Sequence, residues 1–235
     1  MRAAAYFGSQ ALYEDMLVSA TSLLQNAKID RVYFLIEDDA FPYPIPDRVE
    51  VINAKKRLTE WFNEGGPNWH SGWTPMGLVR VAFPKLFPKH SRMLTIDCDT
   101  IVTQDISELW DIHLDDYYFA AVKEPSLSGY THSTYVNAGV MLLNLKKLRE
   151  DHKDDEMIRL LNTRSMYFVA QDAMNATCQG GIYELPGEYN ASAYTVKPAG
   201  TPKIEHYAGT NFLWRMKPLW KEYYAVAFGY KRETV

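Results

Sequence analysis

The chain has 235 residues, a formal net charge of −4, 47% hydrophobic residues and 23% charged residues. This composition is typical of a soluble globular protein that buries its own core without disulfide bonds. The negative charge excludes a global basic field for nucleic acid, and no apolar run approaches the roughly 20 residues of a membrane span.

The two cysteines, Cys98 and Cys178, form neither a metal pattern nor a disulfide framework, which fits a reducing compartment. The first residues lack the long apolar core of a signal peptide, so we expect a cytoplasmic protein. Basic and aromatic residues alternate between residues 214 and 232. We interpret them as a C-terminal helix packed on the domain, with peripheral association at a membrane as the alternative.

The predicted elements alternate along the chain. Short apolar runs bounded by turn residues predict strands at 3–7, 32–36, 49–52, 93–96, 118–122 and 203–207, with a further apolar segment at 135–145. Apolar residues at helical spacing predict helices at 13–26, 75–87, 154–162 and 171–177. This order indicates an α/β fold in one domain, residues 1–235, with a parallel or mixed sheet flanked by helices. Ligands of such sheets bind beyond the carboxyl ends of strands, where the turns at Gly8 and Asp97 lie.

Residues 63–75 contain three glycines and two prolines, which deny them regular structure. Trp69, His70 and Trp73 make this loop unusually aromatic. A functional lid and a plain surface loop anchored by one tryptophan explain these features equally well.

Asp97-Cys98-Asp99 carries the clearest chemistry of the chain. Residues i and i+2 of a strand share a face about 7 Å apart, so both carboxylates can approach one divalent cation if the chain curls there. Hard cations such as Mg²⁺ and Mn²⁺ prefer oxygen ligands and often share them with phosphate. Cys98 would point into the core. A solvated acidic turn at a strand end is the alternative for the triplet alone.

Five segments in order resemble glycosyltransferase family 8, the group of glycogenin and the bacterial lipopolysaccharide galactosyl- and glucosyltransferases. They are the strand 94–102 with its two aspartates, Arg80 seventeen residues before Asp97, the segment 136–145, the segment 171–175, and the segment 204–209 followed by Trp214. The resemblance runs from about residue 1 to residue 215. It implies a GT-A fold, a Rossmann-like nucleotide-sugar transferase domain with a mostly parallel mixed sheet.

The resemblance further implies retaining transfer of a hexosyl or deoxyhexosyl group, usually from a UDP-sugar with Mn²⁺ or Mg²⁺, to a saccharide or glycoconjugate acceptor. The residues that match metal ligands are Asp97, Asp99 and His206. Positions that match the donor site are Tyr6, Phe7, Gly8, Arg80, Asp97, Cys98, Asp99, Asn137, Ala138, Gly139, Gln171, His206 and Gly209. Catalytic roles fall on Gln171, Asp172 and Arg80. Glu124 falls where the family often has an acid in the acceptor cleft, and a solvated loop acid is the interpretation we favour for it.

Three positions differ from the family pattern. Ser9 stands near the base and Ala170 near the sugar hydroxyls, where acids are usual. Phe212 replaces a lysine that would contact the diphosphate, with Arg215 or Lys217 as substitutes. These changes keep open a nucleotide-sugar-binding protein without turnover. A sugar nucleotidyltransferase is a further alternative, although the expected glycine-rich phosphate loop is absent from the first strand. For retention, we favour attack from the face of the leaving group over a covalent intermediate on Asp172.

Overall fold

The computed structural model describes residues 1–71, 74–125 and 134–229. Within these ranges, the strands of the large sheet are β1 (Ala3–Phe7), β2 (Arg31–Ile36), β3 (Val49–Asn53), β4 (Arg92–Ile96), β6 (Phe119–Lys123), β7 (Val136–Asn144) and β8 (Ile182–Leu185). A small second sheet pairs β5 (Thr100–Val102) with β9 (Ile204–His206). The α-helices are α1 (Tyr13–Asn26), α2 (Lys55–Leu58), α3 (Phe83–Leu86), α5 (Leu145–Glu150), α6 (Lys153–Thr163), α7 (Ala170–Thr177) and α8 (Pro218–Ala227). Single turns of 3₁₀-helix occupy Gln10–Leu12, Ser107–Asp111, Gly187–Tyr189 and Leu213–Met216.

The described part of the large sheet has the order β3-β2-β1-β4-β7-β6-β8. β1 pairs in parallel with β2 and β4, β2 with β3, and β6 with β8. Only β7 runs against its neighbours, β4 and β6. The expected mostly parallel mixed sheet is therefore confirmed.

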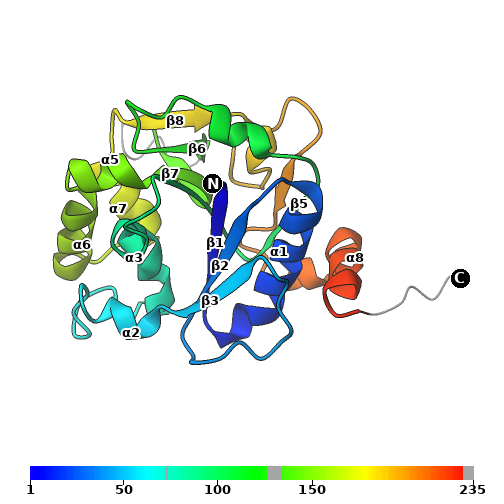
Figure 1. The fold of residues 1–235 in the computed structure, drawn as a ribbon. Helices are drawn as coiled ribbons and strands as arrows, with labels where there is room; N and C mark the ends of the chain where they lie inside the picture. The colour runs from blue at the N-terminus through cyan, green and yellow to red at the C-terminus, as the bar shows by residue number, and fades with distance from the viewer. Residues whose placement is uncertain (72–73, 126–133, 230–235) are drawn as a thin grey trace, which may run out of the picture.

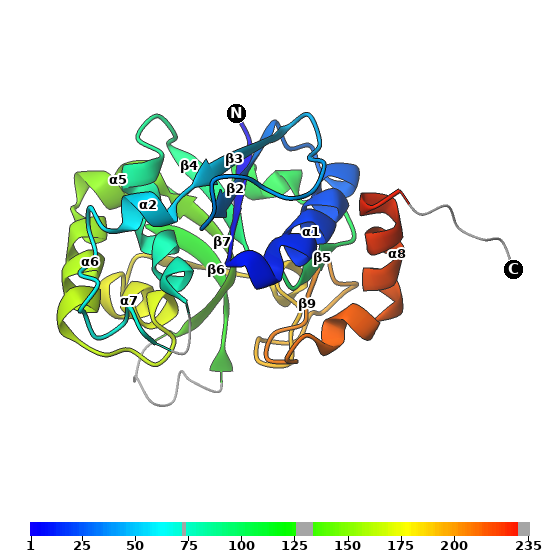
Figure 2. The ribbon, with the colours of Figure 1, turned by 90° about the horizontal axis from the view of Figure 1, so that it is seen from below.

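Helices cover both faces of this sheet (Figures 1 and 2). α5, α6 and α7 pack on one face, whereas α1 packs on the other and α8 lies outside α1. Successive residues of β1 alternate between the two cores: Ala3 and Ala5 face the first helix group, Ala4 and Tyr6 face α1. A strand buried on both faces explains why residues 3–7 read as a continuous apolar run.

The strand order also locates a crevice. The chain proceeds from β1 to β2 and β3 on one side, and then returns to place β4 on the other side of β1. Ligands of open α/β sheets bind where the order reverses in this way, beyond the carboxyl ends of the strands. Asp97 directly follows β4, so this carboxylate lies at the reversal point.

One predicted helix takes a different form. Residues 75–87 were expected to be α-helical, but Pro75–Ala82 is a 3₁₀-helix and only Phe83–Leu86 is α-helical. Pro84 has no N–H to reach the carbonyl of Arg80, and Phe83 N–H bonds that carbonyl instead in the tighter 3₁₀ pattern. Gly77 also lowers the α-helical propensity of this segment.

The expected C-terminal helix packed on the domain is confirmed. α8 packs on α1, where Asn26 donates a hydrogen bond of 2.6 Å to the Tyr223 hydroxyl. In the loop 63–75, residues 72 and 73 lie outside the described residues, so the lid stays a prediction. The assignment of residues 1–235 to one domain also stays a prediction. In the part of the chain that the structure describes, no helix has the length and apolar character to cross a bilayer.

Candidate active site

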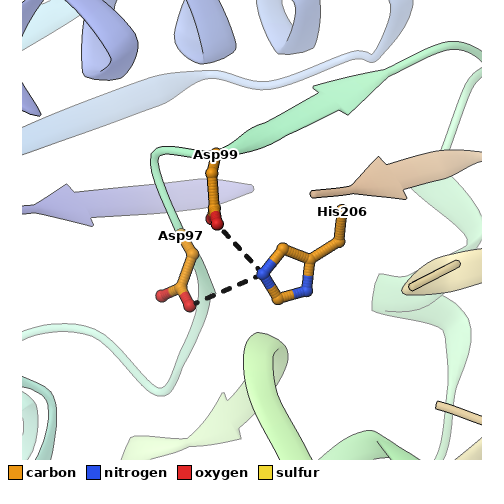
Figure 3. A group of neighbouring side chains, drawn as sticks. All are labelled: Asp97, Asp99 and His206. Atoms are coloured by element: carbon orange, nitrogen blue, oxygen red, sulfur yellow. Dashed lines mark ion pairs between the residues drawn. The ribbon is translucent and has the colours of Figure 1, made fainter. Parts of the chain in front are cut away.

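Asp97 and Asp99 lie close to His206 in space, although more than one hundred residues separate the two aspartates from the histidine in sequence. The two aspartates lie on the turn between β4 and β5, and His206 ends β9. Pairing of β5 with β9 places Thr100 opposite His206, which brings the ring to the turn. Nε2 of His206 lies 3.3 Å from Asp99 and 3.9 Å from Asp97 (Figure 3). One ligand atom from each residue lies within 4.8 Å of the others.

This donor set fits a divalent cation. Two carboxylates and one imidazole are ligands that Mn²⁺ accepts, and the residues are close enough to share one ion. His206 is buried, while the two aspartates are partly exposed. Burial alone would lower the pKa of His206, but the carboxylates of Asp99 and Asp97 outweigh it and raise that pKa.

Hydrogen bonds hold the Asp97-Cys98-Asp99 turn in place. Asp97 N–H donates to the carbonyl of Gly139 at 2.8 Å, and the Thr100 hydroxyl donates to the carbonyl of Asp97 at 2.9 Å. Cys98 is buried in the core, as the alternation predicted, and its thiol donates to the carbonyl of Phe7 at 3.4 Å. Tyr6 is also buried, and its hydroxyl accepts a bond from Ser19. The side chains of both predicted donor-site residues are therefore buried and bonded inside the protein.

Arg80 supplies a fixed positive charge beside the cluster. Its guanidinium forms an ion pair with Asp97 and donates to the Thr95 hydroxyl at 3.4 Å. It also lies over the ring of Phe7, 4.7 Å from the centroid. The arginine is only 5% exposed, so these contacts hold its guanidinium in place.

A second polar cluster lies next to Asp97, Asp99 and His206, and hydrogen bonds join the two clusters. His206 Nδ1 lies 2.7 Å from Asn190 Oδ1, and Asn190 Nδ2 donates to Asn137 Oδ1 at 2.8 Å. Asn137 Nδ2 donates to Glu124 at 3.0 Å, and Gln171 Nε2 donates to the same oxygen at 3.2 Å. The structure thus brings predicted residues from β7, β9 and α7 into one network.

Glu124 corrects one expectation. We favoured a solvated loop acid, but Glu124 is 5% exposed and belongs to this network. β6 ends at Lys123, and the next residue, Glu124, donates its backbone N–H to the carbonyl of Tyr135, the residue before β7. This bond keeps the backbone of Glu124 beside the sheet. Burial raises the pKa of its carboxyl group, and the hydrogen bonds from Asn137 and Gln171 offset only part of this shift.

Gln171 and Asp172 begin α7 beside the network. Gln171 Oε1 accepts the backbone N–H of Ala138 at 2.8 Å. Asp172 accepts hydrogen bonds on both oxygens, from the Tyr135 hydroxyl and from Phe168 N–H. Val169, the residue before the first residue of α7, has φ 41°, a region that a β-branched residue rarely adopts. Backbone strain of this kind accumulates at functional sites.

Two glycines of the site have steric reasons to be glycine. A Cβ on Gly139 would lie 2.1 Å from Cε1 and 2.6 Å from Nδ1 of His206, so the imidazole packs directly on this backbone. Gly209 has φ +73°, and a Cβ there would meet the Tyr194 hydroxyl at 2.5 Å. The absence of a side chain at Gly139 therefore makes room for the His206 ring.

The proposed substitute for the diphosphate lysine is occupied elsewhere. Arg215 forms an ion pair with the fully buried Asp15 and donates to the carbonyl of Ala11 at 3.0 Å. This pairing ties the C-terminal segment to α1 and argues against the expected contact of Arg215 with the diphosphate, which stays a prediction. Lys217, the other substitute, lines an open hollow of about 470 Å³ that also contacts His206 and Ala208.

Sequence reasoning missed Asn190. It is fully buried and links His206 to Asn137. No motif marks it, because its role arises only when the loop after β8 meets β7 and β9. The buried position of Glu124 was likewise invisible, although its place in the family pattern pointed to the site.

Comparison with known proteins places the chain in a family. General stress protein A of Bacillus subtilis (strain 168) is 30% identical over 180 residues, which cover 71% of this chain and 60% of that protein. The lipopolysaccharide 1,2-glucosyltransferase of Escherichia coli (strain K12) is 31% identical over 132 residues, covering 49% of this chain and 38% of that protein. The chain spans about half the length of the curated relatives that it matches.

Solved structures share the fold at low sequence identity. Galactosyltransferase LgtC, in complex with donor and acceptor sugar analogs, superposes with a TM-score of 0.71 at 16% identity, over 99% of this chain and 97% of LgtC. Mouse xyloside xylosyltransferase 1 gives a TM-score of 0.65 at 16% identity, over 88% of this chain and 98% of that protein. The fold is therefore of the GT-A type. The sequence profile of glycosyl transferase family 8 matches residues 6–217. The chain belongs to glycosyltransferase family 8.

Proposed function

We propose that the chain is a metal-dependent, retaining glycosyltransferase that moves a hexosyl or deoxyhexosyl group from a UDP-sugar to a saccharide or glycoconjugate acceptor. One observation carries this proposal: the Asp97–Asp99–His206 cluster is hydrogen-bonded, through Asn190, to the polar cluster around Gln171. A nucleotide sugar carries its diphosphate next to its anomeric carbon. The metal-binding cluster would face the diphosphate, and the adjoining cluster of amides and a carboxylate would face the sugar.

Mn²⁺ or Mg²⁺ held by Asp97, Asp99 and His206 would neutralise the charge that develops on the leaving diphosphate. Arg80 adds a second, permanent positive charge on the Asp97 side. Gln171 and Asn137 are held rigidly by backbone N–H groups, so their amides can orient the sugar without reorganising.

For the transfer step we propose attack from the face of the leaving group. The acceptor oxygen bonds to the anomeric carbon as the sugar–phosphate bond breaks, and the acceptor proton passes to the leaving diphosphate. Hydrogen bonds to both oxygens of Asp172, from Tyr135 and from Phe168 N–H, support this route because they make the carboxylate a poor nucleophile. A glycosylated Asp172 peptide found by mass spectrometry would replace this route by double displacement.

The test is calorimetric titration of the protein with UDP, with and without Mn²⁺, and with GDP as the comparison nucleotide. We expect Mn²⁺-dependent binding of UDP that Asp99→Ala abolishes. Asp105→Ala is the matched control, because Asp105 lies on the same stretch of chain but interacts with Ser107 and Lys28 rather than with His206. Absence of UDP binding under both conditions would overturn the proposed donor.

Binding without turnover is the second candidate function. Ala170 and Phe212, which replace an acid and a lysine of the family pattern, favour it. Release of UDP from a panel of UDP-sugars distinguishes the two, because a binding protein releases none at any metal concentration.

We also propose a cytoplasmic location with at most peripheral contact to membranes, and no nucleic-acid partner. Cys98 and Cys178 are both buried and free, which supports a reducing compartment. Thiol labelling of the protein, denatured directly from cells, would contradict the location if either cysteine were found oxidised.

A further inference from the structure

The chain of side-chain hydrogen bonds that ends at His206 has a direction, and this direction decides which ring nitrogen can bind a metal. We infer that Asn190 is a positioning residue that holds the neutral His206 ring with its proton on Nδ1, so that the Nε2 lone pair faces Asp97 and Asp99. The inference rests on the proposed metal site and assigns a role to a residue outside its ligands.

The direction is set by a backbone group. The N–H of Gly139 can only donate, and it donates to the side chain of Asn137 at 2.9 Å. The atom that receives this bond must be the amide oxygen of Asn137, so its nitrogen points to Glu124, 3.0 Å away. The orientation of Asn137 therefore does not depend on any neighbouring side chain.

Asn190 inherits its orientation from Asn137. The oxygen of Asn137 also accepts a second bond, of 2.8 Å, which only the amide nitrogen of Asn190 can donate. The oxygen of Asn190 must then face Nδ1 of His206, 2.7 Å away. An oxygen acceptor at that distance requires a proton on Nδ1, because two lone pairs would otherwise repel each other.

Burial makes this arrangement durable. Asn190 is 0% exposed, Asn137 7% and His206 5%, so water does not compete for these bonds. A flip of the Asn190 amide would place N–H against N–H at His206 and oxygen against oxygen at Asn137. Both bonds would be lost at once, in surroundings where unpaired polar groups are costly.

The surroundings of Nε2, the other ring nitrogen of His206, explain why a fixed proton on Nδ1 is useful. Nε2 lies 3.3 Å from Asp99 and 3.9 Å from Asp97, and these carboxylates attract a proton to it. A proton on Nε2 blocks the lone pair that a cation needs. Asn190 offers Nδ1 an acceptor of its own, so the single proton of the neutral ring stays on Nδ1 and Nε2 keeps its lone pair. Partners of this kind commonly change metal affinity by 10–100-fold.

The experiment compares Asn190→Leu, Asn190→Asp and the control Asn68→Leu. Leucine keeps the volume but removes the acceptor, whereas aspartate still accepts the Nδ1 proton. Asn68 is an equally buried asparagine whose amide bonds only backbone groups of residues 161, 164 and 166. The readout is Mn²⁺ affinity, from the electron paramagnetic resonance of free Mn²⁺, first with Mn²⁺ alone and then with UDP present.

We expect Asn190→Leu to weaken Mn²⁺ binding by about 10–100-fold. Asn190→Asp should bind more tightly than Asn190→Leu, because it keeps the acceptor for Nδ1 although it loses the donor to Asn137. Asn68→Leu should bind as the wild type. A second readout does not depend on affinity: in the Mg²⁺-saturated protein, ¹⁵N-labelled histidine should show a slowly exchanging Nδ1–H of His206. This signal should be absent in Asn190→Leu, and a His206→Asn variant assigns it.

Two results would overturn the inference while leaving the metal site intact. One is wild-type Mn²⁺ affinity in a folded Asn190→Leu variant. The other is equal loss in the leucine and aspartate variants, which would mean that Asn190 only fills space. If the wild type binds neither Mn²⁺ nor Mg²⁺, with or without UDP, the proposed function fails and the inference fails with it.

Discussion

Replacement of Gly139 by alanine tests how closely the metal site depends on the backbone beneath it. The new Cβ would lie 2.1 Å from Cε1 of His206, whereas ordinary contacts begin at 3.4 Å. The ring must therefore move by more than 1 Å, or β7 must yield along its hydrogen bonds to Asp97 N–H and β4. Metal–ligand distances tolerate about 0.2 Å, so the displaced ring no longer binds the ion.

The expected size of the effect follows from that displacement. Loss of His206 as a ligand should weaken Mn²⁺ binding by at least about 100-fold, which corresponds to about 2.8 kcal/mol. Overpacking should in addition lower the free energy of unfolding by about 1–3 kcal/mol.

The assay is Mn²⁺ titration by calorimetry beside urea denaturation of the same samples. Gly200→Ala is the matched control, because a Cβ there meets only the Glu188 carboxylate at 3.6 Å, an ordinary contact. Wild-type Mn²⁺ affinity in folded Gly139→Ala would refute the steric argument. A loss of stability without a loss of affinity would refute it equally, since the overlap is with the metal ligand itself.

Three further predictions concern the surrounding residues. Asp172→Asn should keep turnover within about tenfold of the wild type, measured as UDP release, because the amide can still bond Tyr135; a loss of more than about 10⁴-fold would indicate a nucleophile. Glu124→Gln should remove a pH dependence of stability. An acid with a raised folded pKa stabilises the fold while protonated, so the wild-type free energy of unfolding should fall, relative to the variant, as pH rises from its ordinary value of 4.5 through the folded pKa. A difference in the free energy of unfolding between the wild type and the variant that stays the same at all pH values, measured by urea denaturation, would contradict this. Arg215→Ala should lower the free energy of unfolding by about 2 kcal/mol, less than for a fully buried pair because Arg215 is 34% exposed, and it should leave UDP affinity unchanged. A selective loss of UDP affinity would return Arg215 to the donor site.

Much of the site was predictable because its residues lie in short segments whose secondary structure follows from the local sequence pattern. Asp97 and Asp99 follow an apolar strand, and Gln171 begins a helix after a loop. Such positions depend on backbone periodicity, which local sequence records. The 3₁₀ form of Pro75–Ala82 was not predicted, although Pro84 carries the physical reason for it.

Other features depend on which segments meet. Arg215 was assigned to the donor by its place in the chain, but α8 and Leu213–Met216 pack on α1 and bring the guanidinium to Asp15 instead. Glu124 was expected in solvent, but the antiparallel return of β7 beside β6 encloses it. A charged side chain pairs with whichever group packing brings near it. The sequence alone does not give the distance between two such groups on different segments.

By itself, the sequence determined the α/β alternation, the family and the residue types of the metal cluster, because these follow from periodicity and from contiguous motifs. Only the tertiary structure decided that Gly139 is small to seat His206, and that Asn190 orients this ring. Both roles arise where β7, β9 and the loop after β8 converge. Steric contact and hydrogen-bond direction between distant segments are properties of that convergence, and no single segment carries them.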